Sequence, residues 1–194
     1  MKKKKVLIVI AIVIVGVIAF ATVAQYQSYQ RLWHVEGEIF IPESPDKVWY
    51  HIATRFDKIE NYSAGVNKSY YVNGHTKSGM GAQRNCEVNP SGFVTETITN
   101  YDQTKKLLEF EVTDGDLPLH YAVGRWELYP ADGGTRVVEK ADFRMKFFFM
   151  NGPAHEDFQQ GINQNLAGLK NLILNDESAN PDNITRIMTR YWTN

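Results

Sequence analysis

The chain has 194 residues with 21 basic and 22 acidic side chains, which gives a formal net charge of −1. This length suffices for one domain with a full hydrophobic core. Without the four lysines at positions 2–5, 17 basic residues oppose 22 acidic ones, a net charge of −5. No basic stripe then remains to neutralise phosphates, which excludes a nucleic-acid partner. The single cysteine, Cys86, excludes a disulfide within the chain.

The first predicted element is a membrane-spanning helix. The four lysines precede an apolar run at 6–24, and a helix of that length extends about 28 Å, close to the hydrocarbon thickness of a bilayer. Flanking lysines stay cytoplasmic, so we expect a single-pass protein of the inner membrane with its domain on the periplasmic, extracytoplasmic side. The alternative is a cleaved signal peptide, with 6–18 as its apolar core and Ala19 and Ala21 at the cleavage site. We favour the anchor because the run reaches spanning length.

The pattern after residue 31 predicts a sheet with one early helix. A polar connector at 25–31 leads to an alternating strand at 33–41, and Ser44 and Pro45 then fit the N-cap and first position of a helix. A second short helical turn is expected at 57–62. Six further strands are predicted between turns rich in Asn, Asp, Gly and Pro. They are 66–72, 81–88, 93–100, 107–113, 120–129 and 135–145.

The C-terminal part is predicted to be helical. Beyond Pro153 apolar residues recur every three or four positions, which predicts one amphipathic helix at 154–174. A polar linker at 175–183 and a short amphipathic helix follow, and so short a helix needs a docking surface. The resulting division is 1–24 for the lysine stub and anchor, 25–31 for the connector, 32–174 for the domain, and 175–194 for the linker and last helix.

Arg84 and Glu96 are each a lone charge on an otherwise apolar strand face. Because strand side chains alternate between faces, both charges are expected to point toward the core. The turn at 89–92 makes their strands a hairpin, so the two charges can meet. An isolated buried charge is very costly, which demands a partner. Two interpretations stay open: a structural ion pair, or a polar anchor inside a ligand cavity.

His120 is the best titratable candidate on the later strands. It shares a strand face with the small residues Ala122 and Gly124, which predicts space beneath a covering helix. The alternative is that the helix backbone simply approaches there. The histidines have no metal-ligand spacing and no glycine-rich nucleotide motif follows a strand, so we predict no metal and no cofactor. Cys86 is expected to be a small buried hydrophobic residue.

The order strand, helix, six antiparallel strands and long helix resembles the helix-grip fold of the SRPBCC superfamily, which includes START lipid-transfer domains and polyketide cyclase-like proteins. Loose motifs between 33 and 174 carry the resemblance. They are 41–49, 79–84, Glu96 with Tyr101 and Asp102, Leu117 and Pro118 with Tyr121, and 126–128 with 134–135. The resemblance implies an α+β fold, with a seven-stranded curved antiparallel sheet wrapped around the long C-terminal helix and the N-terminal transmembrane helix outside it.

We therefore expect a membrane-tethered extracytoplasmic protein that binds a hydrophobic small molecule or lipid between sheet and helix. The fold alone does not assign the activity. The candidate ligand-binding residues are Arg84, Glu96, His120, Trp126, Glu139, Phe143, Phe158 and Ile162.

Three further expectations remain open. No catalytic residue is assigned, but an enzyme of cyclase or dehydratase type is the first alternative, with Arg84 or Glu96 polarising a carbonyl and His120 as base. A chaperone-like or protein-interaction module that uses Tyr191 and Trp192 is the second. The apolar run at 147–150 is expected to pack in the core, or else to form a cavity rim or a patch resting on the bilayer.

Overall fold

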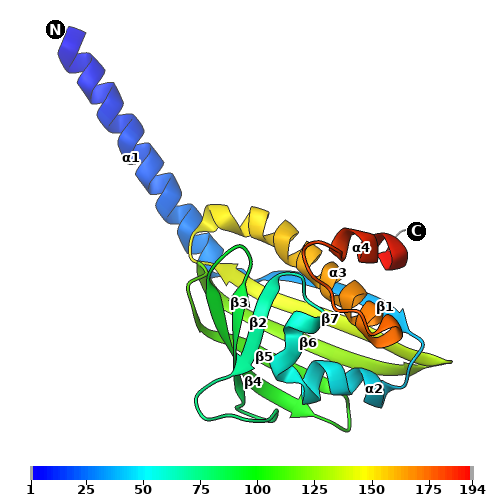
Figure 1. The fold of residues 1–194 in the computed structure, drawn as a ribbon. Helices are drawn as coiled ribbons and strands as arrows, with labels where there is room; N and C mark the ends of the chain where they lie inside the picture. The colour runs from blue at the N-terminus through cyan, green and yellow to red at the C-terminus, as the bar shows by residue number, and fades with distance from the viewer. Residues whose placement is uncertain (1, 193–194) are drawn as a thin grey trace.

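The structure is a computed structural model that describes residues 2–192. The first residue of the predicted lysine stub and residues 193–194 of the predicted C-terminal segment lie outside the described residues. Seven antiparallel strands form a strongly curved sheet, one long helix crosses its concave side, and an N-terminal helix projects away from the body (Figure 1). The predicted α+β helix-grip architecture is confirmed.

The strands lie side by side in the order β1-β7-β6-β5-β4-β3-β2, so β1 pairs with the last strand of the chain. Every predicted strand is present, and no end differs from its prediction by more than two residues. The bounds are β1 (Trp33–Ile41), β2 (Val66–Tyr71), β3 (Gln83–Val88), β4 (Phe93–Asp102), β5 (Leu107–Gly115), β6 (Leu119–Ala131) and β7 (Gly134–Met145).

The helices follow the predicted order. Ser44 caps the early helix, because its hydroxyl accepts a hydrogen bond from the backbone N–H of Lys47 at 3.3 Å. This helix then runs through a π-helical turn into a short 3-10 helix. The bounds are α1 (Lys2–Tyr29), α2 (Pro45–Trp49), η1 (Tyr50–Thr54), η2 (Phe56–Asn61), η3 (Phe148–Met150), α3 (Asn151–Asn175) and α4 (Ile184–Trp192).

Helix α1 is longer than its apolar run. Helix α1 ends at Tyr29, so residues 25–29 of the predicted connector at 25–31 are helical. The Gln25 amide donates to the Lys146 carbonyl and accepts from the Phe148 backbone N–H, both at 3.0 Å. These bonds attach the base of α1 to the domain. Among the described residues, α1 is the one helix long and apolar enough to span a membrane, a property that signal sequences share.

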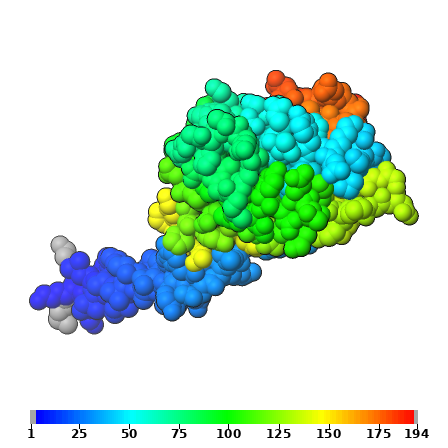
Figure 2. Space-filling model, turned by 90° about the horizontal axis from the view of Figure 1, so that it is seen from below, coloured from blue at the N-terminus to red at the C-terminus, as the bar shows by residue number. Residues whose placement is uncertain are grey.

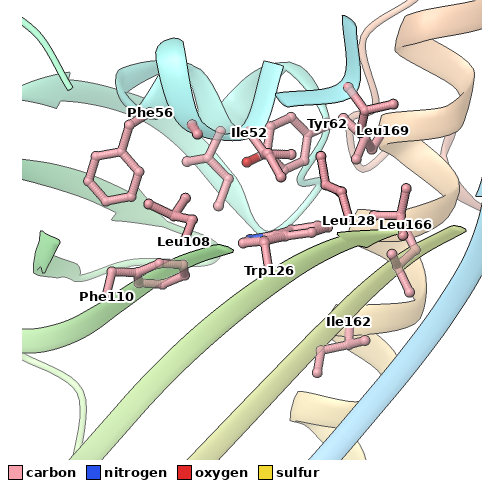
Figure 3. Close-up of a cluster of buried hydrophobic side chains, with 14 of the residues drawn as sticks. Ile52, Phe56, Tyr62, Leu108, Phe110, Trp126, Leu128, Ile162, Leu166 and Leu169 are labelled. Carbon is pink, nitrogen blue, oxygen red and sulfur yellow. The ribbon is translucent and has the colours of Figure 1, made fainter. Parts of the chain in front are cut away.

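The hydrophobic core lies between the sheet, α3 and the η1–η2 segment. Side chains from β6, α3 and the η1–η2 segment interlock there (Figure 3). The residues labelled in that view are Ile52, Phe56, Tyr62, Leu108, Phe110, Trp126, Leu128, Ile162, Leu166 and Leu169.

Two glycines let α3 pack closely. A Cβ at Gly37 of β1 would lie 2.9 Å from Ile162 Cγ2 and 3.0 Å from Leu166 Cδ1, so the missing side chain allows α3 to approach the sheet. Gly168 of α3 faces the backbone carbonyl oxygen of Tyr62, from which an added Cβ would lie only 2.1 Å away. The sheet and the η2 segment therefore each contact α3 at a glycine.

Helix α4 has the docking surface that its length requires. Ile184 and Ile187 are buried against a small cluster that contains Ala64, Ala167 and Ala179. This cluster joins α4 to α3 and to the loop that precedes β2. The C-terminal helix thus packs on the outer side of α3, away from the sheet (Figure 1).

Only part of the apolar run at 147–150 packs against the core as expected: Met150 does, but two of its phenylalanines do not. Phe147 and Phe149 are 52% and 65% exposed, and their rings stack with centroids 5.7 Å apart. They lie next to Phe148, whose backbone is hydrogen-bonded to Gln25 of α1. From below, the segment near residue 150 (yellow) lies beside the base of α1 (blue) (Figure 2). The exposed rings therefore adjoin the apolar helix.

Candidate functional site

Arg84 and Glu96 meet inside the fold, as the hairpin predicted. They are directly opposite each other on β3 and β4. Arg84 Nε donates to Glu96 Oε2 at 2.5 Å, and the two residues are 1% and 8% exposed. Each charge thus has the partner that burial demands.

The Arg84 guanidinium is held by two aromatic rings and a backbone carbonyl. It lies over the Phe56 ring at 3.8 Å and near the Phe110 ring at 5.2 Å, a cation–π arrangement. It also donates a hydrogen bond to the Phe56 carbonyl oxygen. The pair therefore ties the β3–β4 hairpin to η2.

Cys86 lies beside the ion pair but is not an activated thiol. Its sulfur is 3.6 Å from Glu96 Oε2 and 3.7 Å from Ser69 Oγ. Burial, reinforced by the Glu96 carboxylate, raises the pKa of the Cys86 thiol to about 12. A thiol that stays protonated at neutral pH is a poor nucleophile.

A cavity of about 350 Å³ lies between the sheet and α3. Its wall is mainly apolar, with polar side chains gathered on β4, β7 and α3. The apolar lining includes Ile59, Val66, Val88, Val94, Phe110, Val112, Leu117, Ala122, Ala141, Phe158 and Ile162. The polar lining consists of Ser63, Cys86, Glu96, Glu139, Asp157, Gln164 and Asn165.

A second pocket adjoins the cavity at the end of the domain that holds α1. Strands β5 and β6 pair only from Leu107 to Glu111 on the β5 side, although β5 continues to Gly115. Beyond that point the strands separate. A surface pocket that contains His120 and Lys146 occupies this separation. It shares four lining residues with the cavity, and they are Val94, Val112, Leu117 and Ala122.

Glu139 is a buried carboxyl group in the cavity wall. It lies on β7 beneath α3, 7% exposed, and its Oε1 accepts a hydrogen bond from Asn165 Nδ2 at 3.0 Å. Its Oε2 is buried without a hydrogen-bond partner. Burial raises the pKa of Glu139 to about 8, against the Asn165 hydrogen bond and with help from the Glu96 charge. This carboxyl group is therefore mostly protonated at neutral pH.

The eight predicted site residues fall into three groups. Four line the cavity, namely Glu96, Glu139, Phe158 and Ile162. Three others, Arg84, Trp126 and Phe143, are buried behind its wall. Of these, Phe143 supports the lining directly, because its ring stacks on Phe158 at a centroid distance of 4.2 Å. The eighth residue, His120, lies elsewhere.

The predicted inward orientation of His120 is wrong. The β6–β7 pairing shifts register between Leu119 and Tyr121, so strand alternation does not extend back to residue 120. His120 is exposed, and its ring meets the edge of Tyr29 of α1 at a centroid distance of 4.8 Å. It lines the outer pocket rather than the cavity.

The space expected beneath α3 at Ala122 and Gly124 is present, since both residues line the cavity, but the Phe110 ring lies directly against Gly124. Gly124 is paired with Phe110 across β5 and β6. A Cβ at residue 124 would lie 2.5 Å from Phe110 Cζ. The small residue thus accommodates a neighbouring ring at the cavity wall, rather than the helix backbone.

Sequence reasoning missed Asn165, which holds Glu139. The signal was available, since residue 165 is three positions after Ile162 and so lies on the same face of α3. Among the described side chains, no group of three or more His, Cys, Asp or Glu residues is placed to hold a metal ion.

Comparison with known proteins agrees with this architecture. A family described as polyketide cyclase / dehydrase and lipid transport matches residues 32–173. The structure of TTHA0849 from Thermus thermophilus is similar with a TM-score of 0.64 at 19% identity, over 75% of this chain and 100% of that one. The structure of Ara h 8.0201 is similar with a TM-score of 0.62 at 17% identity, over 74% of this chain and 99% of that one. The structure of major latex-like protein 151 from Panax ginseng has a TM-score of 0.59 at 15% identity, over 70% of this chain and 95% of that one.

At these identities the structural likeness shows the fold alone. No curated protein matches the chain in sequence. The family match covers most of the chain and the whole of the sheet and nearly all of α3. The chain therefore belongs to the polyketide cyclase/dehydrase and lipid transport family of the SRPBCC superfamily.

Proposed function

We propose that this protein is a membrane-tethered binding protein that holds a hydrophobic small molecule or lipid in the cavity between the sheet and α3. The observation that carries the proposal is the cavity itself, with its volume of about 350 Å³ and mainly apolar wall. Small-molecule sites have this character, apolar with a few placed polar groups. The family description, which names lipid transport, supports the same class of ligand.

The tether lies at the end of the domain where the outer pocket adjoins the cavity, and in this proposal the outer pocket is the opening of the cavity. The outer pocket that adjoins the cavity contains His120, which touches Tyr29 near the end of α1. With α1 in the inner membrane and its lysines in the cytoplasm, the domain sits on the extracytoplasmic side. The opening then faces the bilayer surface, so a lipidic ligand can exchange without crossing water.

An enzyme of cyclase or dehydratase type is the weaker candidate. Its expected base, His120, is outside the cavity. Cys86 is held in its protonated form. A binding protein needs neither group, and the cavity wall supplies what binding requires.

Filling the cavity tests the binding function. Ala141 lines the cavity on β7, and Ala141→Phe adds bulk there. Native mass spectrometry of the full-length protein, purified from its own membrane, should show a bound hydrophobic molecule that is absent from this variant. Ala131→Phe, at an exposed position on the same sheet, is the matched control and should keep the ligand. A wild-type protein without ligand, or an equally loaded Ala141→Phe variant, would contradict the proposal.

The tether has its own test. The protein should stay in the membrane fraction after carbonate washing, and protease should reach its C-terminus only from the extracytoplasmic side. A soluble product that begins near Thr22 or Gln25 would instead support a cleaved signal peptide.

A further inference from the structure

Glu139 is set apart from the other polar groups of the cavity by an oxygen that nothing in the protein binds. Among the described side chains, seven buried polar atoms lack a hydrogen-bond partner, and only Glu139 Oε2 belongs to a cavity-lining residue. A buried polar atom without a partner is costly unless a ligand or solvent satisfies it. This oxygen is therefore the point at which the wall can hold a polar group of a ligand.

The surroundings of Glu139 leave it without a cation. Arg84 is the buried positive charge nearby, and it is already committed to Glu96 and to the Phe56 carbonyl. Across the sheet, Glu139 is flanked by Trp126 and Gly37, neither of which carries a charge. The Asn165 amide occupies only one carboxyl oxygen. An ionised Glu139 carboxylate would lose its hydration through burial and would be repelled by the negative charge of Glu96.

The other titratable groups do not alter this balance. Those that face the site from its packed elements are Tyr62, Arg84, Cys86, Glu96 and Asp157. Burial raises the pKa of Tyr62 and of Cys86, so both stay neutral up to strongly alkaline pH. Asp157 is exposed at the start of α3. Glu139 thus adds a neutral O–H donor to the wall in the acid-to-neutral range.

We infer that the protonated Glu139 carboxyl group donates a hydrogen bond from its free oxygen to an uncharged oxygen of an amphiphile. That oxygen belongs to an alcohol, ketone or ester. The cavity, in contrast, rejects ligands whose buried end is an anion. This inference rests on the proposed binding function. The last residue of β7 lies at the α1 end of the domain, and Glu139 is six residues before it. Val112 and Leu117 line the opening at the α1 end, so Glu139 lies deeper than they do. The polar end of the ligand therefore enters first, and its apolar part points toward the opening.

The test compares two probes with the same apolar chain, 1-decanol and decanoate. The full-length protein is held in nanodiscs, and each probe displaces a neutral fluorescent naphthylamine dye, with empty nanodiscs as the blank. At pH 6.5, decanol should bind about tenfold or more tightly than decanoate, the discrimination expected when a buried hydrogen bond is lost or an anion is desolvated. Glu139→Gln keeps a neutral donor and should retain decanol binding. Glu139→Leu removes it and should weaken decanol binding about tenfold.

The pH dependence separates a hydrogen-bond donor from a merely structural residue. Raising the pH from 6.5 to 9.5 passes the pKa of about 8 and removes the donor proton, so decanol binding to the wild type should weaken. Binding to Glu139→Gln should not change. Equal decanol affinity in wild type and Glu139→Leu, without pH dependence, would overturn the inference and leave the binding function standing. Failure of both probes to bind any variant would overturn the binding function and this inference together.

Discussion

Arg84 and Glu96 stabilise the fold as a pair, and either residue alone would destabilise it as an unpaired buried charge. Removing either partner leaves a buried charge, so Arg84→Met or Glu96→Leu alone should lower the free energy of unfolding by about 3–5 kcal/mol. The double variant should lose much less than the two singles combined, because no charge is then stranded. Chemical unfolding of the full-length protein in detergent, followed by tryptophan fluorescence, measures the difference. A double variant as unstable as the sum of the singles would show that the residues act independently.

At this scale the sequence predicted contacts wherever strand alternation continues without interruption. The Arg84–Glu96 pairing and the inward position of Glu139 both follow from a period of two. The predicted inward orientation of His120 was wrong because a register shift beside this residue ends the alternation. The ring over Gly124 was unpredictable for a different reason, since it depends on the rotamer of Phe110 on the neighbouring strand. Pattern fixes which face a residue lies on, not what fills the space in front of it.

Among the elements, the contact of α3 with β1 depends on Gly37. A valine there would clash with Ile162 and Leu166, and overpacking of this kind costs about 1–3 kcal/mol. Gly37→Val should therefore lower the thermal unfolding temperature. Gly161→Ala is the control on α3, because no atom lies within 4 Å of the added Cβ and alanine favours a helix. It should keep or raise the unfolding temperature, and an equal loss in both variants would refute the role of Gly37.

The elements themselves were predictable because turns and periodicity mark them locally. The N-cap at Ser44, the turn residues between strands and the apolar period of α3 each act within a few residues. The extension of α1 through the predicted connector was not local, since Gln25 is held by residues more than 120 positions away. The separation of β5 from β6 is likewise a property of the curved sheet rather than of either strand. These two features place the outer pocket beside the base of α1, and neither has a signature in the sequence.

For the whole molecule, three features meet at one end: the base of α1, the exposed rings of Phe147 and Phe149, and the outer pocket that adjoins the cavity. Gln25 directly follows the apolar run and binds Phe148, so the two rings lie near the level at which the run ends. With α1 across a bilayer, that level is the interface, where aromatic side chains are favoured. The exposed rings then keep the opening against the lipid surface.

This arrangement predicts how deeply residue 149 sits in a membrane. The full-length Phe149→Cys variant, labelled with an environment-sensitive NBD dye in proteoliposomes, should emit at shorter wavelength and be quenched by lipids that carry a shallow nitroxide. Cys86 is buried with a raised pKa and should not take the label. Tyr50→Cys is the matched control, because residue 50 is exposed and directly follows α2, which lies at the end of the domain away from α1 (Figure 1). Its label should stay in water and escape quenching. Equal, water-like emission from both positions would mean that the rings do not rest on the bilayer and that the opening is not held against it.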